Sequence, residues 1–395
     1  MESPRRGRGA LIAALVLVVA LLSSSVTALL CTVLPGDALR PLAQMADTIE
    51  RAYYYYDQNV GSEDALVDAA LRGMVASIGD DYAQYYTAEQ YASYTESISG
   101  EYSGIGVVVA APDGEGSAIQ RIYDGSPMAL AGAQAGDLIL SVNGTAVANL
   151  SLEDMLALFH TDGSADTLAL RRDGADFTVT VTAAVVNVPY TSYELLSDGV
   201  GYLRIFGFNG HVVQETGDAL AALVSAGATS LVLDLRDNPG GGLNEVLDVA
   251  DLFLKKGDLI VSIKSRTEQT AAYYAEDDEA YALPLVVLVN GNSASASELL
   301  SGALQDHGVA TILGTQTFGK GIVQSYFRLS ANGGYVKLTT DAYFTPNDVC
   351  IHGVGITPDL VVELPEAYRD LALGSLPREQ DTQLAAAIAY LTEGA

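Results

Sequence analysis

Three short segments that we interpret as buried apolar strands constrain the fold most. They are Leu231–Leu235, Leu285–Val289 and Thr311–Gly314, and helical patterns follow the first two at about 244–254 and 295–305. Buried strands that alternate with helices are typical of an α/β core. Ligand chemistry in such a core gathers at the carboxyl ends of the strands. We therefore expect a functional site in the Gly-rich and Asn-rich loops that follow the first two strands.

The N-terminus carries a targeting or anchoring signal. Arg5, Arg6 and Arg8 precede the stretch 9–36, which contains no charged residue. Its apolar length suits the ~20 residues that span a bilayer, with the arginines on the cytoplasmic side. A cleaved signal peptide fits as well, because small residues precede the end of the stretch. We expect either a cytoplasmic stub at 1–9 with a single-pass anchor at 10–34 in a bacterial cell membrane, or export. Both place the remaining chain outside the cytoplasm.

Composition excludes several classes of protein. The 49 acidic residues outnumber the 20 Lys and Arg, and the resulting net charge of -29 argues against nucleic acid as a partner. A hydrophobic fraction of 49% is too high for a disordered acidic chain. Two Cys cannot build a disulfide framework, and 395 residues suit roughly two or three domains.

Changes in periodicity divide the rest of the chain. Helical spacing of apolar residues predicts two short helices, Leu42 to Tyr53 and Leu66 to Ile78, in an N-terminal helical region at 37–99. Short strands and a helix capped by Ser151 then form a compact module at 100–184. The predicted strands of this module are 104–109, 119–122, 138–142, 168–171 and 177–181. The larger α/β region at 185–375 and a C-terminal helix at 376–395 complete the chain.

A cluster of serines lies where the second buried strand leads into its helix. Ser293, Ser295 and Ser297 alternate with alanines there. Backbone N–H groups at a helix start are unpaired, so they can hold an oxyanion beside a serine nucleophile. Serines also cap helices routinely. This loop alone therefore leaves catalysis and capping open.

A serine nucleophile needs a base, and a lysine is one candidate. His307 lies at a helix end, where we interpret it as structural, and His160, His211 and His352 show no metal spacing and no partner motif. Lys320 lies between two glycines with no acidic neighbour in the sequence. Burial without a counter-ion lowers the pKa of an ammonium group, as a general base requires. A surface lysine in a turn fits the same pattern.

The octet Gly314–Gly321 nearly fits a phosphate-binding loop. Gly321 stands where magnesium binding needs Ser or Thr, and strand-forming residues around Phe327 and Tyr335 follow where a helix should. We therefore reject nucleotide binding. The sequence also lacks the other common catalytic motifs, and we expect no metal and no cofactor.

Three segments in order resemble the carboxyl-terminal processing peptidases, also called tail-specific proteases. They are Asp-Leu-Arg-Asp-Asn-Pro-Gly-Gly at 234–241, Ser-Ala-Ser-Ala-Ser-Glu at 293–298 and Thr-Phe-Gly-Lys-Gly-Ile-Val-Gln at 317–324. The likeness runs from about Tyr53 to the last helix. It implies an α/β (α+β multidomain) fold with a crotonase-like ββα protease core, an inserted PDZ domain and the N-terminal helical region. It also implies a serine endopeptidase that uses a Ser–Lys dyad.

The resemblance assigns catalytic roles to three residues. Ser295 looks like the nucleophile, Lys320 like the base that takes its proton, and Gln324 like the side chain that orients the lysine amine. Phe318 stands where many relatives have Tyr, which is a mild departure from the family pattern.

The resemblance also places an oxyanion hole. The oxyanion would lie between the N–H groups of Ala296 and Gly241, where absent side chains let the backbone approach the substrate. Gly240 or Gly242 could replace Gly241 in that role.

The module at 100–184 resembles a PDZ domain through Gly104-Ile105-Gly106-Val107, which is similar to its carboxylate-binding loop. Successive N–H groups after Gly104 would hold a terminal carboxylate while the substrate adds as a strand to the sheet edge. An ordinary glycine turn is the alternative. A basic residue on a late strand senses substrate in some relatives, and Arg171 or Arg172 is placed for that role.

The implied partners are protein or peptide substrates with free C-termini, cleaved near that end. A catalytically silent PDZ scaffold or chaperone of the same fold is the alternative. The helices before Gly100 and the helix Leu384–Leu391 could pair subunits of a homo-oligomer, but their apolar faces could equally pack internally.

Overall fold

The structure is a computed structural model that describes residues 40–393, except 54, 161, 268–269, 279, 370–372 and 374–375. The anchor or signal segment predicted at 10–34 lies outside the described residues. Among the residues described, none of the helices combines the length and the apolar character needed to cross a bilayer. Contacts divide the chain into two units, one that ends at Thr87 and one that begins at Ala88.

The first unit is mainly helical. Its elements are α2 (Arg40–Ala52), α3 (Tyr56–Asn59), α4 (Glu63–Ala76) and β1 (Gln84–Tyr86). The Ser62 hydroxyl accepts a hydrogen bond from the Ala65 N–H at 3.2 Å and so caps the start of α4. The two helices predicted from apolar spacing are confirmed, and this cap explains why the second begins before Leu66.

The second unit opens with α5 (Ala88–Ile98) and β2 (Glu101–Gly104), which pairs with β9 (Ala184–Asn187). Between β2 and β9 lies the module predicted at 100–184. Its elements are β3 (Val107–Val109), β4 (Ser117–Ile122), α6 (Pro127–Leu130), β5 (Leu138–Val142), β6 (Thr145–Ala146), α7 (Leu152–Leu156), β7 (Ala165–Arg172) and β8 (Ala175–Thr182). The sheet order is β3-β4-β5-β7-β8, so β3 is an edge strand.

One strand prediction in this module is wrong. The expected continuous strand at 104–109 is interrupted, because β2 ends at Gly104 and β3 begins only at Val107. Gly106 has a φ of 83°, a left-handed conformation that breaks a strand. The cap predicted at Ser151 is confirmed, since its hydroxyl accepts from the Asp154 N–H at 3.1 Å.

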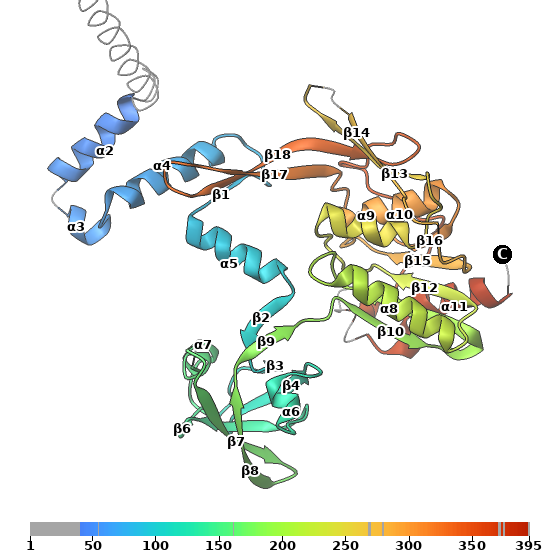
Figure 1. The fold of residues 1–395 in the computed structure, drawn as a ribbon, viewed down its shortest axis with the longest axis horizontal. Coiled ribbons are helices and arrows are strands. Elements are labelled where there is room, and N and C mark those ends of the chain that lie inside the picture. Colours follow the sequence, from blue (N-terminus) through green and yellow to red (C-terminus); the bar gives the residue numbers. More distant parts are fainter. Residues whose placement is uncertain are drawn as a thin grey trace, which may run out of the picture. The chain divides into compact units, whose positions relative to one another are not determined.

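A mostly parallel sheet forms the centre of the larger region (Figure 1). Its strands are β10 (Thr191–Leu195), β11 (Val200–Ile205), β12 (Ser230–Asp234), β15 (Leu285–Val289), β16 (Ala310–Gly314) and β19 (Leu360–Val361), in that spatial order. Only the β10–β11 pairing is antiparallel among these strands. The three buried strands predicted from the sequence are therefore β12, β15 and β16, which are neighbours.

Helices cover both faces of this sheet (Figure 1). On one face, α8 (Val212–Ser225), α9 (Leu243–Asp251) and α10 (Ala296–Asp306) share a core with Leu231 and Leu233 of β12. On the other, α11 (Thr382–Glu393) packs through Leu384 against Val232. Asp234 lies two residues after Val232, so its side chain points to the same face of the sheet, toward α11, and it is fully buried. The interpretation of 231–235 as a wholly apolar strand is therefore wrong at Asp234.

A second, antiparallel sheet carries the segment after Lys320. Strand β18 (Tyr335–Phe344) pairs with β17 (Ile322–Arg328) on one side and β13 (Leu259–Ser265) on the other, and β14 (Thr270–Tyr274) pairs with β13. The strands predicted around Phe327 and Tyr335 are confirmed. Because β17 begins two residues after Lys320, this sheet holds the lysine-bearing loop in place.

Candidate active site

Of the three serines that follow β15, only Ser295 lines a cavity, which has a volume of about 680 Å³. Ser293 and Ser297 are fully buried. The Ser293 hydroxyl donates to the Leu235 carbonyl at 2.8 Å, and the Ser297 hydroxyl donates to the Asn238 carbonyl at 2.9 Å. These two serines therefore tie the two strand-end loops together, and Ser295 is left as the nucleophile candidate.

Ser295 lies in a sharp turn between β15 and α10. Its φ of 56° and ψ of -114° are unusual for a residue with a side chain, and such strain is concentrated at functional sites. Its backbone N–H donates to Oε2 of Glu298 at 2.8 Å. The next residue, Ala296, is the first of α10, so its N–H has no acceptor within the helix. The turn thus places a hydroxyl and an unpaired helix-start amide side by side.

Lys320 lines the same cavity as Ser295. Burial lowers the pKa of its ammonium group, and the charge of Lys337, which also lines the cavity, lowers it further. The charge of Glu298 raises this pKa. The fold therefore brings an acidic residue near Lys320, although none lies beside it in the sequence. The net effect favours the neutral amine that a general base requires.

Glu298 is the anchor of this site, and the sequence analysis missed it. Its side chain is fully buried, and its two oxygens accept four hydrogen bonds. The donors are the N–H of Ser295 at 2.8 Å, the N–H of Lys320 at 2.8 Å, the N–H of Gly319 at 2.6 Å and the hydroxyl of Thr317 at 2.6 Å. The Ser-x-x-Glu spacing of a capping box was the signal that could have revealed it.

Two further side chains complete the cavity near Lys320. Gln324 lines it from β17, and its Nε2 is buried without a hydrogen-bond partner in the described chain. Tyr343 lines it from β18 and donates its hydroxyl to the Lys320 carbonyl. Burial and then Glu298 raise the pKa of Tyr343, while a hydrogen bond with Ser295 opposes them, so this phenol stays neutral. Sequence reasoning missed Tyr343.

The glycine loop after β12 contributes backbone groups to the cavity. The Gly240 N–H donates to Asn238 Oδ1 at 2.9 Å, and the Gly242 N–H donates to the Phe208 carbonyl at 2.7 Å. No such bond is found among the described residues for the N–H of Gly241. A Cβ on Gly240 would lie 3.0 Å from the Ala296 nitrogen, so the loop meets the start of α10. Of the three glycines, Gly241 is thus the one with an N–H left for an oxyanion.

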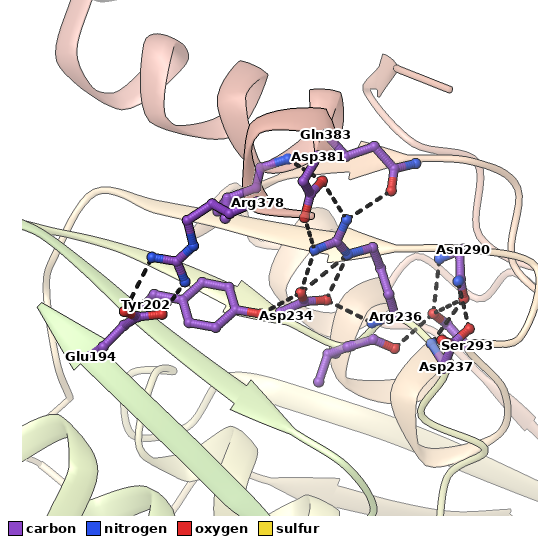
Figure 2. Close-up of polar contacts among 12 residues, drawn as sticks. Glu194, Tyr202, Asp234, Arg236, Asp237, Asn290, Ser293, Arg378, Asp381 and Gln383 are labelled. Carbon is purple, nitrogen blue, oxygen red and sulfur yellow. Dashed lines mark hydrogen bonds and ion pairs between the residues drawn. The ribbon is translucent and has the colours of Figure 1, made fainter. Parts of the chain in front are cut away.

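A buried ionic cluster lies next to this loop, on the α11 side of the sheet (Figure 2). Arg236 donates to Asp234 at 2.6 Å and to Asp381 at 2.8 Å, and also to Gln383 at 3.1 Å. The Tyr202 hydroxyl donates to Asp234 at 2.7 Å. Burial works against the charge of Arg236, but the Asp234 carboxylate outweighs it and keeps the pKa of Arg236 above its ordinary value. The cluster joins the end of β12 to the start of α11.

The residue after Arg236 joins the ends of β12 and β15. Asp237 donates its N–H to Asn290 Oδ1 at 3.0 Å, and its carboxylate accepts from the amides of Asn290 at 2.8 Å and Asn292 at 2.9 Å. Figure 2 shows Asp237, Asn290 and Ser293 grouped at these two strand ends. The loops that carry Gly241 and Ser295 are therefore cross-linked by polar side chains.

The module at 100–184 has a cavity of its own, of about 250 Å³. Predicted loop residues Gly104, Ile105 and Val107 line it together with Met155 and Phe159. It lies between the edge strand β3 and the segment that contains α7. Its other lining residues are four apolar ones, Val109, Ile139, Leu156 and Ala183, and four with polar groups, Tyr102, Ser103, His160 and Asp166. Such a groove suits an extended peptide with an apolar side chain.

Gly106 gives this loop its shape. Its φ is 83°, and a Cβ there would lie 2.0 Å from the Ser126 side chain. The Ser126 hydroxyl donates to the Gly106 carbonyl at 3.3 Å, which holds the loop against α6. Glycine is therefore required both for the backbone angle and for the close approach.

The two arginines considered as substrate sensors are bonded within the module. Arg172 donates twice to Asp137, at 2.7 Å each, and lies over the Phe177 ring with 5.1 Å between Cζ and the centroid. Its hydrogen bonds lower the pKa of the buried Asp137 carboxylate. Arg171 donates to Asp176 at 2.6 Å. A role in sensing would need one of these pairs to open, and it stays a prediction.

The histidines do not enter the cavity around Ser295. His307 lies 2.8 Å from the Leu259 carbonyl, which agrees with the structural role expected for it. His160 pairs with the buried Asp166 at 2.6 Å in the module at 100–184. His211 pairs with Glu101 at 3.0 Å.

The chain is similar to known proteins over most of its length. The model of peptidase family S41 matches residues 199–362, and the PDZ domain model matches residues 95–170. The chain is 36% identical to the carboxy-terminal-processing protease of Bartonella bacilliformis over 351 residues, which cover 86% of this chain and 80% of that protein. It is 33% identical to the carboxy-terminal processing protease CtpA of Bacillus subtilis over 327 residues, which cover 81% and 69%.

A solved structure is similar as well. The photosystem II D1 C-terminal processing protease matches with a TM-score of 0.50 and 28% sequence identity, covering 84% of this chain and 95% of that one. Together these similarities confirm the predicted fold class, a serine protease fold of the S41 type with a PDZ domain.

Proposed function

This chain belongs to peptidase family S41 and is a serine-type peptidase with a PDZ domain, and we propose that it cleaves proteins near their C-termini with a Ser–Lys dyad. The observation that carries the proposal is the convergence of Ser295, Lys320 and Gln324 on one cavity. Gln324 lies on a different sheet from the strand that precedes Ser295, and Lys320 lies in the loop that leads into that second sheet.

In the proposed first step, Ser295 Oγ attacks the carbonyl carbon of the scissile peptide bond. Neutral Lys320 accepts the hydroxyl proton, and the negative charge passes to the carbonyl oxygen, between the N–H groups of Ala296 and Gly241. The C–N bond then breaks, Lys320 returns the proton to the leaving amine, and an acyl-enzyme remains. Water hydrolyses this ester through the same groups.

Three structural features support these roles. The unpartnered Gln324 Nε2 lies in the cavity wall, where it can help to orient the Lys320 amine. The other two glycine amides of the loop are already bonded, which supports Gly241 in the oxyanion hole. Buried Glu298 fixes the backbones of both Ser295 and Lys320, so their side chains start from a rigid frame.

We propose that residues 100–184 form the PDZ domain and 185–375 the protease core, with the loop Gly104, Ile105, Gly106 and Val107 holding the substrate's terminal carboxylate. The apolar cavity beside the loop supports an apolar C-terminal side chain. The exposed edge of β3 supports addition of the substrate as a further strand. Substrates are then proteins or peptides with free C-termini.

We also propose that the catalytic region works outside the cytoplasm. Arg5, Arg6 and Arg8 before an uncharged stretch support either a single-pass anchor or a cleaved signal. N-terminal sequencing of the protein from membrane and soluble fractions distinguishes the two. An intact N-terminus in the soluble cytoplasmic fraction contradicts both.

A cleavage assay tests the proposed function. Full-length protein is incubated with a peptide whose free C-terminus is apolar, and fragments are identified by mass spectrometry. Ser295→Ala should abolish cleavage, and Lys320→Ala should remove it to a similar extent because the dyad works as a unit. Cleavage that survives Ser295→Ala contradicts the assignment. Peptide binding without cleavage by the parent protein would favour the silent scaffold instead.

A further inference from the structure

The carboxylate-binding loop proposed above is already covered by a side chain of this protein. Tyr102 and Gly104 lie two residues apart on β2 and therefore on the same face of the strand. The position that a Cβ on Gly104 would occupy lies only 2.3 Å from Tyr102 Cε2 and 2.8 Å from Cδ2. The ring thus lies directly against Gly104, in the space that any other residue there would fill.

The Tyr102 hydroxyl reaches the next two loop amides. The backbone N–H groups of Gly106 and Val107 lie near enough to its oxygen to lower the pKa of the phenol. Burial raises the pKa of Tyr102, the neighbouring Tyr123 adds to this, and the two backbone N–H groups oppose the rise. Tyr102 also lines the apolar cavity of the module, so the ring lies in the groove and the oxygen at the loop.

The loop carbonyls, by contrast, are used by the fold. The Ile105 carbonyl accepts from the Met128 N–H at 3.0 Å, and the Gly106 carbonyl accepts from the Tyr123 N–H at 3.0 Å. The loop therefore points its carbonyls into the module and presents amides to Tyr102. Amides presented in succession form an anion-binding site.

We propose that Tyr102 is a self-ligand of the carboxylate-binding loop, which a substrate's terminal carboxylate must displace. This inference rests on the proposed function of the loop. A carboxylate carries a full charge and two acceptor oxygens, so it forms stronger hydrogen bonds with the two amides than a phenol does. A peptide amide or an internal chain segment lacks that advantage. Tyr102 therefore raises the threshold for binding, which a ligand with a free terminal carboxylate overcomes more readily.

Peptide binding tests the proposal. The full-length chain with Ser295→Ala, which should not cleave, is titrated with a fluorescent peptide that ends in an apolar residue, as the free acid and as the amide. Tyr102→Phe keeps the ring and removes the competing oxygen. It should bind the acid about three- to tenfold more tightly, because the loop no longer has to release a hydroxyl. Affinity for the amide should rise by a similar factor, because the amide has to displace the same hydroxyl.

Tyr123→Phe is the matched control. Its ring lies edge-on to Tyr102 with 6.4 Å between centroids, and it contributes only its backbone N–H to the loop. This variant should bind both peptides like the parent. Thermal melting of each variant verifies that the fold is retained.

Two results would overturn the inference, and they differ. If the parent prefers the acid but Tyr102→Phe binds it equally or more weakly, Tyr102 is a part of the groove and not a competitor. If no variant distinguishes the acid from the amide, the loop does not bind a carboxylate, and that part of the proposed function fails together with the inference.

Discussion

Ser295 and Lys320 are far apart in the sequence, yet their backbone N–H groups donate to the same atom, Oε2 of Glu298, at 2.8 Å each. A fully buried carboxylate therefore sets the spacing between the proposed nucleophile and its base. Glu298 thus positions each residue through its main chain.

Replacing this carboxylate should impair catalysis. In Glu298→Gln, the amide NH2 faces N–H donors that were hydrogen-bonded before, and buried donors without acceptors are costly. We expect kcat/KM for peptide cleavage to fall by about tenfold to a hundredfold. Asp306→Asn is the control, because Asp306 lies at the other end of α10 and accepts the Asn347 N–H at 2.8 Å. Equal activity of both variants would contradict the role of Glu298.

The pH dependence of cleavage should depend on Lys337. Activity requires neutral Lys320, so kcat/KM should rise with pH through the pKa of Lys320, which is lower than usual because of burial and Lys337. Lys337→Gln removes one of these causes, raises that pKa and moves the rise to higher pH. At pH 7 we expect kcat/KM about three- to tenfold below the parent, with recovery at high pH. Lys337→Arg, which keeps the charge, should match the parent profile.

The same burial should make Lys320 costly for stability. Its pKa in the folded protein lies below the unfolded value, so between these two values the unfolded chain binds more protons, and stability rises with pH. Lys320→Met should raise the free energy of unfolding by about 0.5–2 kcal/mol at pH 7 while abolishing cleavage. It should also remove that rise with pH. Urea denaturation at pH 7 and pH 10 measures both effects, and lower stability at pH 7 would count against the prediction.

The buried ionic cluster should be needed for stability. Arg236→Met leaves the buried carboxylates of Asp234 and Asp381 without their shared guanidinium. We expect the free energy of unfolding to fall by about 3–5 kcal/mol. Arg378→Met is the matched control, since Arg378 pairs with Glu194 at the exposed surface, where a pair contributes about 0–1 kcal/mol. A similar loss of unfolding free energy in both variants would contradict the prediction that the buried ion pairs stabilise the fold more than the exposed pair.

The glycine loop should tolerate no side chain at Gly241. A Cβ there would lie 2.2 Å from the Phe208 carbonyl oxygen, so Gly241→Ala must shift the loop and its N–H. We expect kcat to fall by about a hundredfold to a thousandfold, as for a lost oxyanion donor. Gly217→Ala in α8 is the control, because nothing lies within 4 Å of its added methyl group. It should leave kcat unchanged and increase stability slightly.

Much of the architecture could be predicted from local patterns. Apolar periodicity located β12, β15 and β16 and the helices α9 and α10, since those elements bury side chains at intervals that the sequence displays. Short motifs sufficed to single out Ser295, Lys320 and Gln324 as candidates, because family resemblance is carried by contiguous residues. The strand assigned to 104–109 failed because one positive φ, at Gly106, outweighs the β-forming residues around it.

Only the tertiary structure decided which groups meet. It gave the physical reason why Ser293 and Ser297 are not available as nucleophiles, which is that their hydroxyls are bonded to the neighbouring strand-end loop. It showed that Asp234 is paired, through Arg236, with Asp381, which directly precedes the distant helix α11. Buried charges require partners, but the partner's position depends on how the sheet and helices pack. The sequence by itself therefore determined the elements and the candidate residues, whereas packing of remote segments determined their contacts, their burial and their protonation.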